Sequence, residues 1–270
     1  MSLPSSMGLA GPPLSRWRSS TGSWLPALAL SLVMLLVWEA VVRFFQVSAF
    51  IIPAPTAIAV ALMREWASLA DAATVTAREI LVGFLASAAV GVALALLIVR
   101  FGWLGRALYP LVVLFQNVPK VALAPIFILW FGYGLAPKIG LIVVIAFFPV
   151  TLSMLAGLES VDPSLLALMR SVGTGATDIL FKIRVPHSLP NLMAGLKIAA
   201  TFSVIGAIVG EFAGASAGLG YVIQFASTQL DTPLVFAGLV IVSILGVGFY
   251  YVVEMLERLA VPWAPKFNTG

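Results

Sequence analysis

Long runs of apolar residues dominate this sequence and decide its secondary structure. A bilayer core about 30 Å thick is crossed by about 20 apolar residues in a helix. Two such runs, 107–136 and 188–213, are interrupted by charges or prolines. Four others contain at most one charged residue: 24–42, 80–99, 139–158 and 232–253. The pattern therefore predicts about six membrane-spanning helices.

The chain is predicted to be all-α, a polytopic membrane helical bundle. We expect spans at about 24–45, 76–100, 107–133, 137–158, 188–213 and 232–256. The transmembrane domain then covers 22–262, between a disordered tail at 1–21 and a short tail at 263–270. The first span is expected to be retained, because its apolar run is too long for a signal peptide and no cleavage site follows it. Short helices are also predicted at 56–70 and 219–229.

The composition agrees with a lipid-facing exterior. Hydrophobic residues make up 61% of the chain and charged residues 10%, whereas soluble domains average about 25% charged residues. The absence of cysteine and the single histidine predict no metal site, and we expect no cofactor bound by this chain. Membrane proteins collect basic residues in their inner loops, so the net charge of +4 does not call for a nucleic-acid partner.

The distribution of basic residues predicts the orientation. With the N-terminus inside, ten Lys and Arg residues fall in inner stretches and four in outer stretches, and Lys120 is left within the membrane. Inner loops carry the excess of positive charge in membrane proteins. Both termini are therefore expected in the cytoplasm.

The longest predicted inner connection, 159–187, contains a pair of short helices. Asp162 followed by Pro163 is a typical helix start, and Gly173 supplies a turn after the first helix. The second helix is expected to end at Pro186. An apolar face on the first helix is formed by Leu165, Leu166, Leu168 and Met169. From these residues alone, an interfacial hairpin without any partner is an open alternative.

This connection resembles the cytoplasmic coupling loop of ABC-importer permeases. The family signature is Glu-Ala-Ala, three residues, Gly, nine residues, then Ile-x-Leu-Pro; Gly173, Ile183 and Pro186 fall on it without a gap. The opening triplet differs, because Ala167, Leu168 and Met169 stand in place of Glu-Ala-Ala. The resemblance implies contact with an ATPase for Leu165, Leu166, Ala167, Leu168, Met169, Arg170, Gly173, Ile183 and Pro186.

Other motifs are similar to the nitrate/sulfonate/taurine branch of that family. They are NVPKVALAP at 117–125, WFGYG at 130–134, GEF at 210–212 and GLGY at 218–221. The resemblance covers most of the chain. It implies the type I ABC-importer (MetI-like) permease fold in the inner membrane of a bacterium.

The resemblance also implies partners. They are a second copy of the chain, two cytoplasmic ATPase subunits and a periplasmic or lipid-anchored substrate-binding protein. The sequence has no Walker A pattern, Gly-x4-Gly-Lys-Ser/Thr, so ATP and Mg are expected on the ATPase. The chain is thus predicted to be a permease with no catalytic residue, in contact with membrane lipid.

Three polar residues in apolar segments are candidates for the translocation path: Asn117, Lys120 and Glu211. An ionisable group costs at least about 2.5–3.5 kcal/mol at the bilayer centre and normally faces protein or water. Lys120, between Pro119 and Pro125, could line a path for an anionic solute, or it could pair with Glu211. The small residues at 214–218 could form an external gate or simply allow close helix packing.

The predicted function is the transmembrane subunit of an ATP-binding-cassette importer. The solute is expected to be a small anion such as a sulfonate, nitrate or carboxylate, delivered by an external binding protein. A neutral pyrimidine-like or riboflavin-like vitamin precursor is the alternative. A secondary transporter or a membrane-embedded enzyme is a different class, for which the sequence shows neither an internal repeat nor clustered acids.

Overall fold

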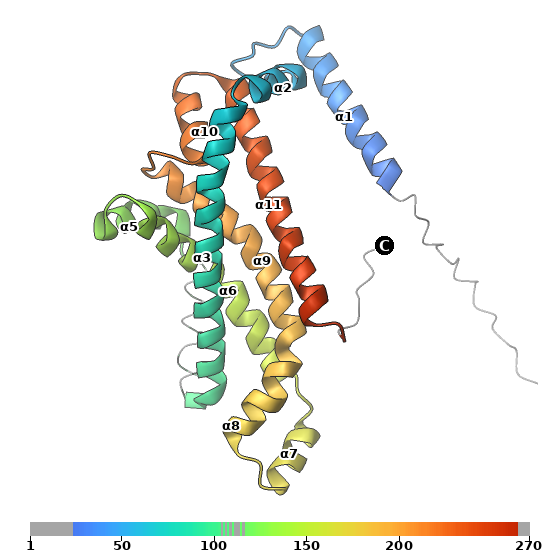
Figure 1. Ribbon diagram of the computed structural model, residues 1–270, viewed down its shortest axis with the longest axis vertical. Helices are drawn as coiled ribbons and strands as arrows, with labels where there is room; N and C mark the ends of the chain where they lie inside the picture. The colour runs from blue at the N-terminus through green and yellow to red at the C-terminus, as the bar shows by residue number, and fades with distance from the viewer. Residues whose placement is uncertain are drawn as a thin grey trace, which may run out of the picture.

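A computed structural model describes residues 24–263, except 104, 106, 108–109, 111–113 and 115–116. The described residues form helices joined by short connections, which confirms the all-α membrane bundle (Figure 1). Five helices are long and apolar enough to cross a membrane. They are α1 (Trp24–Phe44), α3 (Trp66–Arg100), α6 (Leu135–Glu159), α9 (Val185–Phe212) and α11 (Thr232–Ala260). The shorter elements are α2 (Pro55–Arg64), η1 (Lys120–Leu123), α5 (Ala124–Phe131), α7 (Pro163–Ser171), α8 (Ala176–Ile179), η2 (Leu180–Arg184) and α10 (Leu219–Thr228).

Helix α6 is the centre of the bundle and packs between α3 and α9. Its Ile142 and Val150 are completely buried. Two glycines of α3 make this possible, because a β-carbon at Gly83 would meet Ile142 and one at Gly91 would meet Val150. Small residues let helix backbones approach closely where there is no water to drive association. The three helices therefore form a filled core.

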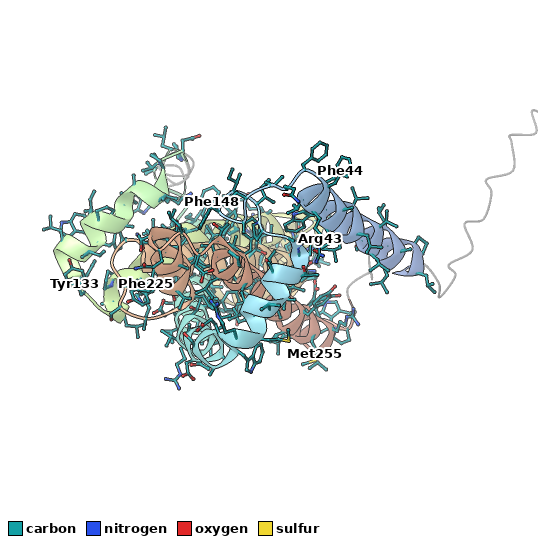
Figure 2. The ribbon with its side chains drawn as sticks, turned by 90° about the horizontal axis from the view of Figure 1, so that it is seen from above. Arg43, Phe44, Tyr133, Phe148, Phe225 and Met255 are labelled. Atoms are coloured by element: carbon teal, nitrogen blue, oxygen red, sulfur yellow. The ribbon has the colours of Figure 1, made fainter. Side chains whose placement is uncertain are left out.

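Helices α11 and α1 lie outside this core in different ways. Helix α11 packs on α9, and its Phe249 meets Phe84 of α3 edge to face. Helix α1 exposes most of its apolar side chains and touches the rest of the protein near its end, where Trp38 contacts Phe236. In Figure 2, α1 with Arg43 and Phe44 projects from one side of the bundle, opposite Tyr133. A helix so exposed is stable only with lipid or protein against it.

The two ends of the bundle carry different short helices. Figure 1 shows α2 and α10 at one end and α7 and α8 at the other. Helix α1 runs towards the α2 end and α11 runs back towards the α7 end, so the start of α1 and the end of α11 both point to the α7 side. We call these the outer end (α2 and α10) and the inner end (α7 and α8). The names follow the orientation expected from the basic residues.

The predicted span 107–133 is not one continuous helix in its described part. Residues 117–119 are non-helical, Pro119 precedes η1, and α5 has 8 residues. A helix of that length cannot cross a core that needs about 20 residues. The remainder of this segment lies largely outside the described residues, so the sixth span stays a prediction.

Three predicted short elements can be compared with the structure. The helix expected at 219–229 is confirmed by α10. The helix expected at 56–70 is wrong, because α2 ends at Arg64 and the chain turns at Glu65 (φ −102°, ψ 17°) before α3 begins. The charged pair Arg64 and Glu65 lies at this corner, where Arg64 also binds Asp231.

The expected helix end at Pro186 is also wrong. Helix α8 continues through η2 into α9, so Pro186 is the second residue of α9. A proline inside a regular α-helix loses one hydrogen bond and clashes with the carbonyl four residues earlier. Element η2 is a π-helical turn, whose wider spacing accommodates this proline.

Candidate functional site

The inner hairpin, residues 159–187, begins with a capped helix. The Asp162 carboxylate accepts a hydrogen bond from the Ser164 backbone N–H at 2.7 Å, and Pro163 occupies the first turn of α7. Both residues satisfy helix-start requirements that depend only on local sequence. The predicted start of α7 is confirmed.

Helix α7 ends in a Schellman motif centred on Gly173. The backbone N–H of Thr174 donates to the Met169 carbonyl, and that of Gly173 donates to the Arg170 carbonyl. Gly173 has φ +80°, and a β-carbon there would touch no other atom within 4 Å. The position requires glycine for its left-handed backbone and not for space.

The residues predicted to contact an ATPase divide into two faces. Leu166 is buried, with 8% of its surface exposed, in a small core with Val161 and Ile179. Met169 and Ile183 pack against this core from the side. Leu165 and Leu168 point away from it and are 42% and 59% exposed. The exposed residues at the surface are Leu165, Ala167, Leu168, Arg170, Gly173 and Pro186. The hairpin is thus folded by one face of α7 and presents the other.

A groove of about 400 Å³ lies beside the exposed face. It is open to the surrounding space and mainly apolar, with Leu165, Ile183 and Trp263 among its lining residues. Asp162 and Lys182 supply charge at its edge. The groove can accept an apolar side chain of another protein.

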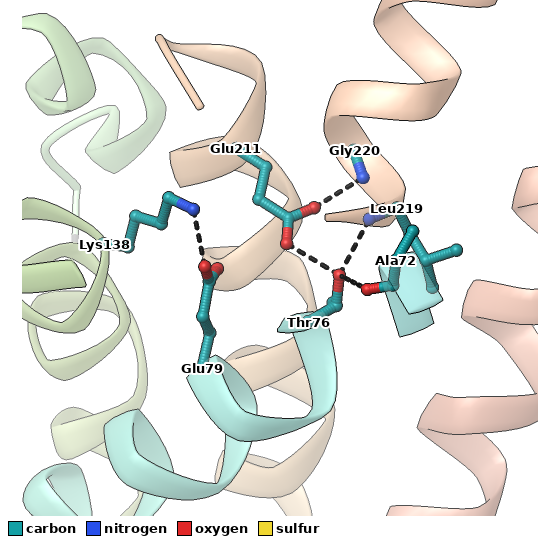
Figure 3. Close-up of polar contacts among 7 residues, drawn as sticks. All are labelled: Ala72, Thr76, Glu79, Lys138, Glu211, Leu219 and Gly220. Carbon is teal, nitrogen blue, oxygen red and sulfur yellow. Dashed lines mark hydrogen bonds and ion pairs between the residues drawn. The ribbon is translucent and has the colours of Figure 1, made fainter. Parts of the chain in front are cut away.

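The outer end contains a buried polar cluster, which we call the outer cluster: Thr76, Glu79, Lys138 and Glu211 (Figure 3). Glu211, 1% exposed, accepts hydrogen bonds from Thr76 Oγ1 (2.7 Å) and from the backbone N–H of Gly220. Thr76 Oγ1 in turn accepts a hydrogen bond from the Leu219 N–H at 2.8 Å. The carboxylate therefore lies at the N-terminus of α10, where the helix dipole favours negative charge.

The second half of the outer cluster is an ion pair between α3 and α6. Lys138 Nζ lies 2.5 Å from Glu79 Oε1, and both side chains are nearly inaccessible. The other oxygen, Glu79 Oε2, has no hydrogen-bond partner within the described part of the chain. Breaking such a pair leaves a buried charge uncompensated. The outer cluster thus joins α3, α6, α9 and α10.

The sequence interpretation missed three members of the outer cluster. Glu79 and Lys138 were not singled out as candidates, and the predicted alternative pair of Lys120 with Glu211 is not among the contacts that the structure shows for Glu211. Within the described residues, Lys138 is the cation of the cluster, and its partner is Glu79. One signal was available, because Thr76 and Glu79 are three residues apart and lie on one face of a helix.

Lys120 and Asn117 lie elsewhere, near α6. Lys120 Nζ is 6.0 Å from the centre of the Phe148 ring, within range of a cation–π contact, and the side chain is half-buried. Asn117 is exposed. Glu211 is not brought together with these two residues, so the three predicted path residues do not form one site in this chain. Their placement on a translocation path stays a prediction.

Five helices long enough to cross a membrane and a hairpin with an exposed apolar face define the class: an integral membrane protein with a surface suited to a partner protein. The family model "Binding-protein-dependent transport system inner membrane component" matches residues 87–261. The chain belongs to this family, and it is the transmembrane subunit of an ATP-binding-cassette importer.

Individual proteins support the same family. The formylaminopyrimidine transport permease protein ThiX of Halalkalibacterium halodurans is 36% identical over 87% of this chain and 94% of its own length. A putative aliphatic sulfonates transport permease protein, SsuC of Bacillus subtilis, is 31% identical over 91% of this chain and 90% of its own. Among solved structures, an inward-facing MetNI methionine ABC transporter matches with a TM-score of 0.57 and 24% identity, over 74% of this chain and 96% of that one. That likeness confirms the type I importer fold.

Proposed function

We propose that the exposed face of α7 is the surface on which the importer's ATPase acts. The observation that carries this proposal is the division of α7 into a buried face, which folds the hairpin, and an exposed apolar face at Leu165 and Leu168. Exposed apolar side chains on a short, capped helix are suited to a groove on a partner protein. Movement of the ATPase would then move the hairpin and, through it, the spans.

A pull-down experiment tests this surface. The double variant Leu165→Gln/Leu168→Gln should lose most of the ATPase that co-purifies with the wild-type chain. The substitutions remove the exposed apolar surface, whereas the buried face that folds the hairpin is unchanged. The control is Leu259→Gln, which changes a leucine at the inner end of α11 that is more exposed than either of these two. Full ATPase recovery with the double variant would overturn the assignment of α7.

The inner end is proposed to face the cytoplasm, with both chain termini on that side. Four basic residues at the inner end support it: Arg100, Arg170, Lys182 and Arg184. In membrane proteins, the ends of spans that carry more Lys and Arg residues lie on the cytoplasmic side. A cysteine placed at Ser171 should react with a membrane-impermeant maleimide only after the membrane is opened; reaction in intact spheroplasts would reverse the orientation.

The translocation path is proposed to run between two copies of this chain. Ile80, Ile142, Val150 and Ala207 are completely buried and fill the middle of the bundle. Because the core of one chain is filled by side chains, the solute is expected to pass along the interface between two copies of the chain. Chemical cross-linking in native membranes should yield a dimer; a functional complex with a single copy would contradict the proposal. A binding protein would deliver the solute at the outer end.

The solute is proposed to be a small organic or inorganic anion, such as a sulfonate. Lys120 supports it, since a cation at a half-buried position lowers the barrier for an anion. The similarity to ThiX favours a second candidate, a neutral pyrimidine. A thermal-shift screen of the cognate binding protein against both classes distinguishes them, and Lys120→Met with Lys120→Arg tests the residue: uptake of an anion should fall in the first variant and persist in the second.

A further inference from the structure

A second pocket lies at the inner end, and three arginines line it. It has a volume of about 140 Å³ and lies between the last turn of α3, the end of α7, and the segment α8–η2. Arg100, Arg170 and Arg184 each come from a different one of these parts. The apolar side chains of Val99, Ile179 and Leu180 form the rest of the wall. We call this the arginine pocket.

No acidic residue lines the arginine pocket, and none of its arginines forms an ion pair with any residue that the structure describes. The nearby Asp178 is already paired with Lys182 at 2.7 Å. The Cζ atom of Arg100 lies 5.3 Å from the centre of the Phe101 ring, within range of a cation–π contact. Three positive groups around one small space repel one another unless an anion joins them.

Guanidinium groups are suited to one type of anion. Their planar N–H groups match the oxygens of phosphate and carboxylate in pairs, and arginine is preferred where such recognition is needed. The pocket is smaller than the roughly 300–1,000 Å³ of a typical small-molecule site. It therefore fits a single anionic group and not a complete transported solute.

The position of the pocket indicates which molecule carries that group. Arg100 is the last residue of α3, a membrane span, so the pocket lies at the level where the span leaves the apolar core. Above it along α3, the apolar side chains Leu85, Val90 and Leu97 are exposed. A phospholipid would place its phosphate in the pocket and its acyl chains along these residues. Basic pockets at the cytoplasmic ends of spans bind anionic lipid headgroups in this way.

We propose that Arg100, Arg170 and Arg184 bind the phosphate group of an anionic phospholipid at the inner membrane surface. The bound phosphate joins the end of α3 to α7 and to the segment leading into α9. An anionic lipid is then a ligand of this permease, at a site that uses Arg170 in the last turn of α7 but not Leu165 or Leu168, the residues that carry the proposal for the ATPase surface. The proposal does not depend on that surface, because the lipid is bound by the chain alone.

Lipid retention by the full-length chain tests the proposal. The purified protein is exchanged into nanodiscs that contain phosphatidylglycerol and phosphatidylcholine in equal amounts, and the lipids that remain after detergent extraction are measured by native mass spectrometry. Wild type should retain phosphatidylglycerol selectively. Arg100→Gln/Arg184→Gln should reduce this selectivity about tenfold, because each basic residue contributes appreciably to anionic-lipid binding. Arg170 is left unchanged, since it also belongs to α7.

A control variant and a competition experiment distinguish a lipid phosphate from free inorganic phosphate. Lys182→Gln removes one positive charge from the same segment without altering the arginine pocket, and it should retain the selectivity of wild type. Competition by inorganic phosphate at low millimolar concentration, without any lipid preference, would assign the site to free phosphate instead of lipid. Equal lipid retention by wild type and the double variant would overturn the proposal. It would also be overturned if the substitutions weakened the binding of an acidic peptide from the ATPase and left lipid retention unchanged.

Discussion

The carboxylate of Glu211, near the end of α9, accepts a hydrogen bond from the backbone N–H of Gly220 in the first turn of α10. The residues are nine positions apart, and the chain between them makes the outer turn. One buried carboxylate thus fixes the start of a short helix. Its other oxygen is bound by Thr76 of α3, so the contact also joins α10 to the bundle.

Replacing Glu211 should destabilise the outer end. Glu211→Ala leaves the Gly220 N–H and Thr76 without their acceptor, and a buried unsatisfied group costs about 1–3 kcal/mol. Glu211→Gln keeps one carbonyl acceptor and should cost less. Thermal unfolding of the purified protein in detergent measures both. Glu65→Gln, at the partly exposed corner between α2 and α3, is the control, and a Glu211→Ala midpoint equal to that of the control would contradict the assignment.

Gly218 should not tolerate a side chain. A β-carbon there would overlap the Glu211 carboxylate, and the backbone has φ +111°, which side chains rarely adopt. Gly218→Ala should therefore lower the unfolding midpoint. Gly248→Ala is the matched control, because a β-carbon at Gly248 meets no atom within 4 Å and alanine is favoured in a helix by about 1 kcal/mol. Equal midpoints for the two variants would show that the tight approach at Gly218 is not required.

The buried pair of Glu79 and Lys138 should show strong coupling. Lys138→Met leaves the Glu79 carboxylate buried without its cation, which typically costs about 3–5 kcal/mol. The double variant Glu79→Gln/Lys138→Met removes both charges and should recover much of this loss. Chemical unfolding of four proteins, namely wild type, Glu79→Gln, Lys138→Met and the double variant, gives the interaction energy. Simple additivity of the two single changes would mean that the ion pair does not stabilise the protein.

Gly173 should be required for the inner hairpin through its backbone alone. Gly173→Ala places a side chain at φ +80°, which costs roughly 1–2 kcal/mol. We expect faster proteolysis at the hairpin and weaker ATPase recovery. Gly175→Ala provides the comparison, because Gly175 has φ −66° and a β-carbon there would make only ordinary van der Waals contact, with Asp178 Oδ2 at 4.0 Å. Indistinguishable proteolysis of the two variants would remove the conformational argument.

The parts that the sequence predicted well depend on local signals. Five of the expected spans correspond to helices long and apolar enough to cross a membrane. An apolar run of about 20 residues has few stable conformations in a bilayer other than a spanning helix. The start of α7 follows from Asp162 and Pro163, which are adjacent, and its end from Gly173. Each of these features requires only neighbouring residues.

The parts that were missed depend on residues far apart in the chain. Glu79 and Lys138 are 59 positions apart and become partners only when α3 and α6 pack together. A count of basic residues assigns Lys138 to one side of the membrane. Such a count cannot show that Lys138 is buried against Glu79. Pro186 was expected to end a helix, since the π-helical turn that accommodates it has no simple sequence signal.

That turn has a mechanical consequence. Residues Ala176–Phe212 form one helical segment of 37 residues, about 55 Å long at 1.5 Å per residue. One extremity carries the packing partners of α7, and the other carries Glu211. A helical segment without a loop couples its two ends, so a displacement of the inner hairpin would also move the end of α9 that carries Glu211, whose carboxylate binds the start of α10. Within this segment, the π-helical turn at Leu180–Arg184 and Pro190 are the places where the helix can bend.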